Sequence, residues 1–148
     1  MVHSWRRDEF EITTDPSRVD VDAVHAFLAA CSWAQDIPRD VLLRSIEHSL
    51  PFSLWSPDRQ VGFARVVSDR ATFAYVGDVF VLPDYRRRGL SVWLMQVIVS
   101  HPDLQGLRRW SLLTRDAHGL YEKVGFRPLA NPSRWMELHD PDVYSRSR

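Results

Sequence analysis

The first third of the chain changes from a strand pattern to a helical one. Residues 10–13 predict a short strand, which the Asp-Pro-Ser turn at 15–17 ends. Apolar residues at helical spacing then predict a helix behind Asp20, a suitable N-cap, and Pro38 suits the first turn of a second helix. A loop that contains Trp33 joins the two helices.

The middle of the chain predicts an antiparallel meander followed by an apolar helix. Residues 52–55 and 60–67 predict a hairpin around a Ser-Pro-Asp-Arg turn, and residues 72–82 predict a third, longer strand. From Gly89 the apolar residues recur with a period of 3.6, until His101-Pro102 ends the helix. A helix this apolar must be packed on more than one side.

The last third predicts a strand, a short helix and a final strand. These elements are expected at 107–114, 117–124 and 135–138, with Gly125 as the left-handed residue after the helix. The extreme N-terminus and residues 145–148 are expected to be frayed. The element order predicts a mixed α/β fold.

Length and composition narrow the class of protein. A chain of 148 residues, 45% hydrophobic and 26% charged, is expected to be one ordered domain over residues 1–148. Its formal net charge of zero disfavours partners held by bulk charge, so we expect neither nucleic-acid nor membrane binding. The single cysteine, the lack of metal-ligand spacing and the charged N-terminal residues predict no disulfide, no metal and a cytoplasmic location.

The junction after the third meander strand carries the strongest chemical signal. A strand ends at Pro83, Arg86-Arg-Arg-Gly89 forms a loop, and the apolar helix begins at once. Free N–H groups at a helix start, a glycine and adjacent guanidinium groups together suit a pyrophosphate, although an arginine run can also be a solvated turn. The fingerprints GxxxxGK[ST] and GxGxxG are both absent, which argues against a P-loop ATPase and a Rossmann dehydrogenase.

Two segments resemble the GNAT superfamily of N-acetyltransferases. The loop resembles the superfamily's acyl-CoA motif [QR]-x-x-G-x-[GA] through Arg86 and Gly89, with Ser91 at the last position. A second segment resembles its C-terminal A-x-x-L-Y-x-x-x-G-F block through Ala117, Leu120, Tyr121, Gly125 and Phe126. The chain departs from the pattern at Arg87, where glycine is common, and at Thr114, where asparagine is common. The resemblance implies a mostly antiparallel mixed sheet flanked by helices, with the cofactor at a strand-loop-helix junction.

The resemblance also implies acetyl-CoA as co-substrate. Its pyrophosphate is expected on the amides of residues 87–91, and its pantetheine arm along residues 79–81. Tyr121 matches the position from which the family's tyrosine protonates the CoA sulfur, and the alternative is a core aromatic with a satisfied hydroxyl. The oxyanion donor is expected to be the backbone N–H of Val81 or of a neighbour. The implied cofactor residues are Val79, Phe80, Val81, Arg86, Arg87, Arg88, Gly89, Leu90, Ser91 and Thr114.

Three residues are candidates for the acceptor side. Asp78 lies among apolar strand residues, so it is expected either to bind the amine, to remove its proton through water, or to make a structural hydrogen bond. Trp33 is a candidate pocket wall, or else a core or dimer contact. Arg65 could bind an acidic substrate, and with Asp78 it gives opposite indications about the charge of the acceptor.

The sequence therefore predicts an acyltransferase that moves an acetyl group to a primary amine of a small molecule or peptide. The reaction is expected to proceed by direct attack in a ternary complex of acetyl-CoA and the amine acceptor. The alternative is an acyl-CoA-binding sensor that acts through a protein partner. Tyr121 favours the enzyme, because a sensor needs no acid for a thiolate. A homodimer is left open.

Overall fold

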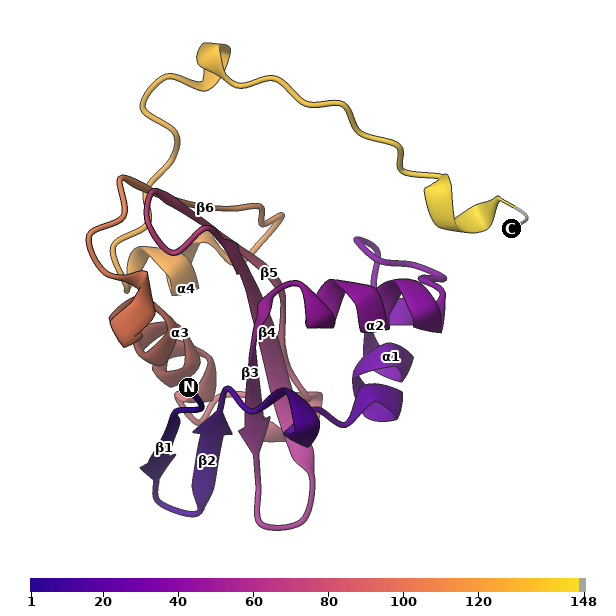
Figure 1. The fold of residues 1–148 in the computed structure, drawn as a ribbon, viewed down its shortest axis with the longest axis vertical. Coiled ribbons are helices and arrows are strands. Elements are labelled where there is room, and N and C mark those ends of the chain that lie inside the picture. The colour runs from indigo at the N-terminus through magenta and orange to yellow at the C-terminus, as the bar shows by residue number, and fades with distance from the viewer. Residues whose placement is uncertain (147–148) are drawn as a thin grey trace.

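The computed structural model describes residues 1–146, which form a six-stranded mixed sheet with helices on both faces (Figure 1). The strands lie in the order β1-β2-β3-β4-β5-β6, and all neighbours are antiparallel except the parallel pair β5 and β6. Their bounds are β1 (Ser4–Arg7), β2 (Phe10–Thr13), β3 (Leu50–Trp55), β4 (Gln60–Ser68), β5 (Phe73–Val81) and β6 (Arg109–Leu112). The predicted mixed α/β fold with a mostly antiparallel sheet is confirmed.

Four α-helices cover the two faces of this sheet within the described residues. They are α1 (Val21–Ala29), α2 (Arg39–Glu47), α3 (Leu90–Ser100) and α4 (His118–Glu122). In Figure 1, α1 and α2 lie on one side of the sheet and α3 and α4 on the other. Asp20 caps α1 as predicted, because its carboxylate accepts a hydrogen bond of 3.1 Å from the N–H of Ala23.

Each face of the sheet has its own apolar core. The side chains of Leu94, Met95 and Ile98 on α3 are completely buried against one face. On the opposite face, α1 and α2 pack over Phe63 and Phe80, and the ring of Phe27 stacks on Phe80 with centroids 4.0 Å apart. The expectation that α3 is packed on more than one side agrees with the six buried residues on this helix.

A bulge in β5 changes which of the two cores the side chains of the strand face. The register runs from Phe63 opposite Phe80 to Arg65 opposite Gly77, so β5 has one more residue than β4 in this interval. Asp78 lies in the bulge with a φ of 55°. Val76 consequently faces the α3 core while Phe80 faces the α1 and α2 core, although alternation alone would place the two on one face.

The parallel pair β5 and β6 separates halfway along β5. Pairing between the two strands ends at Val76 and Leu112, but β5 continues to Val81. The last five residues of β5 therefore pair with β4 on one edge and with no described strand on the other.

The polar start of the chain is more ordered than expected. Ser4–Arg7 forms β1, which pairs antiparallel with β2 at the edge of the sheet. Three of its four residues are exposed, so the strand lacks the apolar alternation by which a sequence reveals a strand. Backbone pairing, with Trp5 packed against the α3 core, is what orders it.

The predicted strand at 135–138 is wrong. After α4 the chain leaves the body of the protein as an arm, drawn in yellow in Figure 1, which contains only two short 3-10 turns among residues 127–146. The side chains of Met136 and Leu138 are fully exposed there, at 96% and 106% of the reference area. At the expected frayed end, Ser145 closes a turn and Arg146 pairs with Asp140, whereas residues 147 and 148 lie outside the described residues.

The buried ring of His101 predicts a pH dependence of stability. Burial holds its pKa below the ordinary value of 6.5, and Nδ1 accepts a hydrogen bond from the N–H of Asp103, which needs a neutral ring. The unfolded chain then binds the proton first, so the free energy of unfolding should fall as the pH drops below 6.5, by up to about 1.4 kcal/mol per unit. His101→Asn keeps an acceptor for the same N–H and should flatten this slope in denaturant titrations. Equal slopes in both proteins would show that His101 does not cause the effect.

Candidate active site

The start of α3 is open to an anion. Gly89 precedes the helix with a φ of 74°, and the first helical bond runs from the N–H of Trp93 to the carbonyl of Gly89, 3.0 Å away. The N–H groups of residues 90–92 therefore have no acceptor within the helix. A pocket of about 220 Å³ opens at this point, lined by Tyr85, Arg86, Arg87, Gly89, Leu90, Ser91, Val92 and Lys123.

Three cations line this pocket, two from the loop and one from the end of α4. Arg86 is anchored, because its Nε donates a 2.9 Å hydrogen bond to the carbonyl of Val81. Arg87 has a φ of 64°, a backbone conformation that glycine adopts without strain, which accounts for glycine at this position of the motif. Lys123 was missed by the sequence analysis, although it stands two residues after Tyr121 in the second motif. Arg88 instead lies over the ring of Tyr85, 5.3 Å from its centroid, and does not line the pocket.

A fourth cation, Arg7, approaches Gly89 from β1. A Cβ atom at Gly89 would lie 3.3 Å from Nη2 of Arg7, whose guanidinium also sits over the ring of Trp93. The sequence analysis missed Arg7 because it did not predict β1. The helix start thus combines free N–H groups with positive charge from three separate elements, which suits a pyrophosphate.

The open edge of β5 presents backbone hydrogen-bonding groups. The N–H of Leu82 donates to the carbonyl of Val61 at 2.8 Å, so by antiparallel alternation the N–H of Val81 points away from β4. This group faces the edge that β6 leaves unpaired, and Val79 precedes it at the end of the bulge. The side chain of Phe80 lies in the α1 and α2 core, so Phe80 could contact a ligand on this edge with its backbone alone.

Tyr121 offers a protonated hydroxyl. Its side chain is buried, and burial raises the pKa of the phenol above its ordinary value, with a smaller contribution from the charge that Tyr75 would carry. The hydroxyl makes no hydrogen bond within residues 1–146. A phenol that stays neutral at pH 7 and has no protein acceptor can donate its proton to a leaving group. Thr114 stabilises the start of α4, the helix that contains Tyr121, since its hydroxyl accepts a 3.0 Å hydrogen bond from the N–H of Ala117.

The structure brings the three candidates for the acceptor side together. One oxygen of Asp78 accepts a 3.0 Å hydrogen bond from Nε1 of Trp33, and the other accepts a 2.6 Å charged bond from Nε of Arg65. The side chain of Asp78 is 10% exposed and that of Arg65 is 21% exposed, whereas Trp33 in the loop between α1 and α2 is mostly exposed. Both carboxylate oxygens therefore have partners.

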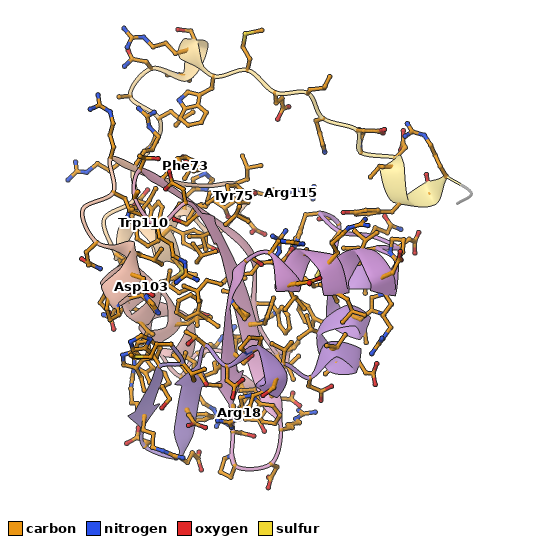
Figure 2. All side chains as sticks on the ribbon, viewed as in Figure 1. Arg18, Phe73, Tyr75, Asp103, Trp110 and Arg115 are labelled. Carbon is orange, nitrogen blue, oxygen red and sulfur yellow. The ribbon has the colours of Figure 1, made fainter. Side chains whose placement is uncertain are left out.

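Tyr75 borders this cluster and was missed by the sequence analysis. A Cβ atom at Gly77 would lie 3.2 Å from the Tyr75 ring and 4.0 Å from Nη2 of Arg65. Burial raises the pKa of the Tyr75 phenol, and the charge of Asp78 raises it further. Figure 2 shows Tyr75 toward the upper end of β5, at the same end of the sheet as Arg115 from the loop after β6. Tyr75 pairs with Val67, and Gly77 two residues later pairs with Arg65. This two-residue spacing on one strand is the signal that could have found Tyr75.

The described part of the chain offers neither a membrane-spanning helix nor a metal site. Among residues 1–146, no helix is both long and apolar enough to cross a membrane. No three His, Cys, Asp or Glu side chains of these residues are grouped in a way that could hold a metal ion.

Comparison with known families agrees with this geometry. The family model described as "Acetyltransferase (GNAT) domain" matches residues 47–128, which include β3 to β6, α3 and α4. FG08082 of Gibberella zeae, an acetyltransferase by name, is 32% identical over 143 residues, covering 81% of this chain and 80% of that protein.

Solved structures show the same fold. A protein of Xanthomonas campestris pv. campestris, assigned by name to the GNAT acetyltransferases, is 50% identical with a TM-score of 0.88, over 99% of this chain and 98% of that one. An acetyltransferase by name from Clostridium acetobutylicum, solved with acetyl-CoA, has a TM-score of 0.65 at 12% identity, over 94% of this chain and 96% of that one. The second likeness is one of fold.

Proposed function

Because the chain belongs to the GNAT acetyltransferase family and is an acyltransferase, we propose that it transfers the acetyl group of acetyl-CoA to a primary amine. One observation carries this proposal: the open-edged strand β5 leads directly into an uncapped helix start surrounded by cations. The acceptor is a small molecule or peptide, which attacks the thioester directly while both substrates are bound.

The pyrophosphate of acetyl-CoA would lie at the start of α3. Residues 89–92 supply the glycine and the free N–H groups there, and Arg86, Arg87 and Lys123 supply positive charge. The pantetheine arm would follow the open edge of β5, where its amides can pair with the backbone as an added strand does. Thr114, whose hydroxyl accepts a hydrogen bond at the start of α4, would border this arm on the side of that helix.

The proposed transfer needs an oxyanion donor and an acid. When the amine nitrogen bonds to the acetyl carbon, the N–H of Val79 or Val81 would stabilise the charge on the carbonyl oxygen. The carbon–sulfur bond then breaks, and Tyr121 would give its proton to the departing sulfur. The neutral, unpartnered hydroxyl of Tyr121 favours this role over a sensor function.

We assign Asp78 a positioning role on the acceptor side. Each of its oxygens already accepts a hydrogen bond, from Arg65 or from Trp33, which favours a positioning role over proton removal. Asp78 would instead fix the guanidinium and the indole that border the acceptor. The amine proton would leave to solvent, before or after attack.

Gly89→Val should weaken acetyl-CoA binding at least about 10-fold, because the branched side chain occupies the approach to the free N–H groups and meets Arg7. Isothermal titration with CoA measures the effect. Gly106→Val is the matched control, since Gly106 has the same φ of 74° with nothing within 4 Å of a Cβ, so it reproduces the backbone strain alone. Equal CoA affinity in the two folded variants would remove this loop from the proposed site.

A further inference from the structure

The guanidinium of Arg65 has one side paired and the other side unpaired. Its Nε is bonded to Asp78, while Nη1 and Nη2 make no hydrogen bond within residues 1–146. The side chain as a whole is 21% exposed. Because Asp78 fixes the orientation of the group, the two terminal nitrogens form a fork of fixed direction.

The surroundings of the fork are suited to a flat anion. Gly77 lies opposite Arg65 in the register, and a Cβ atom there would lie 3.2 Å from the Tyr75 ring and 4.0 Å from Nη2 of Arg65, so the ring and the guanidinium flank the backbone of this glycine. The Tyr75 hydroxyl makes no hydrogen bond within residues 1–146 and is held protonated by burial, so it is a further donor. Asp78 already neutralises the guanidinium, which disfavours a dianion and favours a single negative charge.

From these contacts we propose that Arg65, Tyr75 and the backbone at Gly77 form a carboxylate subsite, so that the acceptor is an amine that also carries a carboxylate, such as an amino acid. This inference rests on the proposed acetyl transfer and names its substrate class. A carboxylate matches the guanidinium fork with two parallel N–H···O bonds, and Tyr75 donates a third. The subsite lies beside the core that contains Tyr121, because Val76, between Tyr75 and Gly77, is buried in that same core.

Binding without turnover tests the subsite. The protein saturated with CoA is titrated calorimetrically with each common amino acid and with its amide, which keeps the amine and removes the negative charge. For at least one amino acid, the Kd should be at least about 10-fold lower than the Kd of its amide. This ratio corresponds to about the free energy of one charged hydrogen bond. Arg65→Gln should abolish the difference, Arg65→Lys should restore part of it, and Tyr75→Phe, which keeps the ion pair, should reduce it about 3-fold or more.

The outcomes separate the subsite from the enzyme activity. If no amino acid binds more tightly than its amide, or if Arg65→Gln keeps the preference, the carboxylate subsite is wrong. Acetylation of simple amines in that case would leave the proposed function standing. Failure of any amine to accept an acetyl group would overturn the function, while a measured carboxylate preference in binding would still support the subsite.

A second inference comes from the C-terminal arm and does not depend on the function. The sheet ends at β6, whose outer edge pairs with no described strand. Trp135 lies against Arg109 at the start of β6, with the guanidinium 5.3 Å from the ring, but the next apolar side chains, Met136 and Leu138, are fully exposed. Tyr144 near the end of the arm packs against the α1 and α2 core. The arm is thus held at both ends with its apolar middle uncovered.

We infer that a second copy of this chain covers the arm, with residues 135–138 of each copy pairing with the edge of β6 in the other. Residues 135–138 lie on the arm whose Trp135 already contacts the start of β6, and the outer edge of β6 is open, so a two-fold axis would satisfy both in a single closed interface. The alternation of Met136 and Leu138 with Glu137 is the pattern of a strand with one buried face.

Light scattering with hydrogen exchange tests this interface. The wild-type chain should have the mass of a dimer, with the amides of residues 135–138 protected from exchange. Met136→Arg combined with Leu138→Arg should give a folded monomer without that protection, while Val143→Arg, an exposed apolar position elsewhere on the arm, should leave the dimer intact. A wild-type monomer, with the segment protected or not, would overturn the inference, as would a dimer that survives the double substitution.

Discussion

Tyr121→Phe is expected to lower kcat by about 10²–10⁴-fold, the usual contribution of a positioned general acid. The substitution keeps the ring and its edge contact with Phe126, and it removes only the hydroxyl, which has no other partner within residues 1–146. Stability and the KM for acetyl-CoA should therefore change little. Thiol release under saturating substrates measures the effect.

Tyr85→Phe is the matched control for this change. Tyr85 lines the pocket at the start of α3, and the guanidinium groups of Arg59 and Arg88 lie over its ring. It has no assigned part in proton transfer. Its kcat should stay close to that of the wild type. Because burial raises the pKa of Tyr121, loss of its proton should not reduce the rate below about pH 10. A kcat near wild type in Tyr121→Phe would show that water or another group protonates the sulfur.

Asp78→Ala is expected to lower the free energy of unfolding by about 3 kcal/mol. The change leaves the guanidinium of Arg65 largely buried with no carboxylate, and it removes the acceptor of the Trp33 indole. Asp103→Ala is the matched control, because the pair of Arg70 and Asp103 is exposed, at 48% and 41%, and should contribute less than about 1 kcal/mol. Denaturant titrations measure both, and equal losses would contradict a structural role for the Asp78 pair.

Asp78→Asn separates positioning from proton removal. Asparagine keeps the shape of the side chain and an acceptor for Trp33, so kcat/KM for the acceptor should fall by about 10-fold or more with a pH profile parallel to that of the wild type. If the loss of kcat/KM disappears as the pH rises, Asp78 is the base, because at high pH the amine is already deprotonated and needs no base.

The elements that frame the proposed cofactor site can be predicted from the sequence more readily than the contacts on the proposed acceptor side. The apolar period of α3, the glycine before it and the motif around Tyr121 are local signals, and the structure has these elements where the periodicity indicates them. Asp78 could not be interpreted in this way. Its partners lie 45 and 13 residues away, and the bulge that turns it toward them breaks the alternation on which a strand prediction depends.

The residues that were missed share a physical reason. Arg7 and Tyr75 are brought to the site by strand pairing, which the sequence does not reveal. Arg7 lies on β1, a strand without apolar alternation. Tyr75 is a candidate only because Gly77, two residues later, pairs with Arg65. The segment at 135–138 has a strand pattern but no partner within the described chain, and a strand needs an edge to pair with.

Acceptor-dependent release of CoA thiol tests the central claim most directly. Wild-type protein is incubated with acetyl-CoA and a panel of amino acids, polyamines, aminoglycosides and peptides, with the acetylated product identified by mass. The account predicts that at least one amine stimulates thiol release, that the same amine gains one acetyl group, and that Tyr121→Phe loses both signals together. Thiol release that no amine stimulates, in a protein that binds CoA at the start of α3, would contradict acetyl transfer and favour a sensor of acyl-CoA.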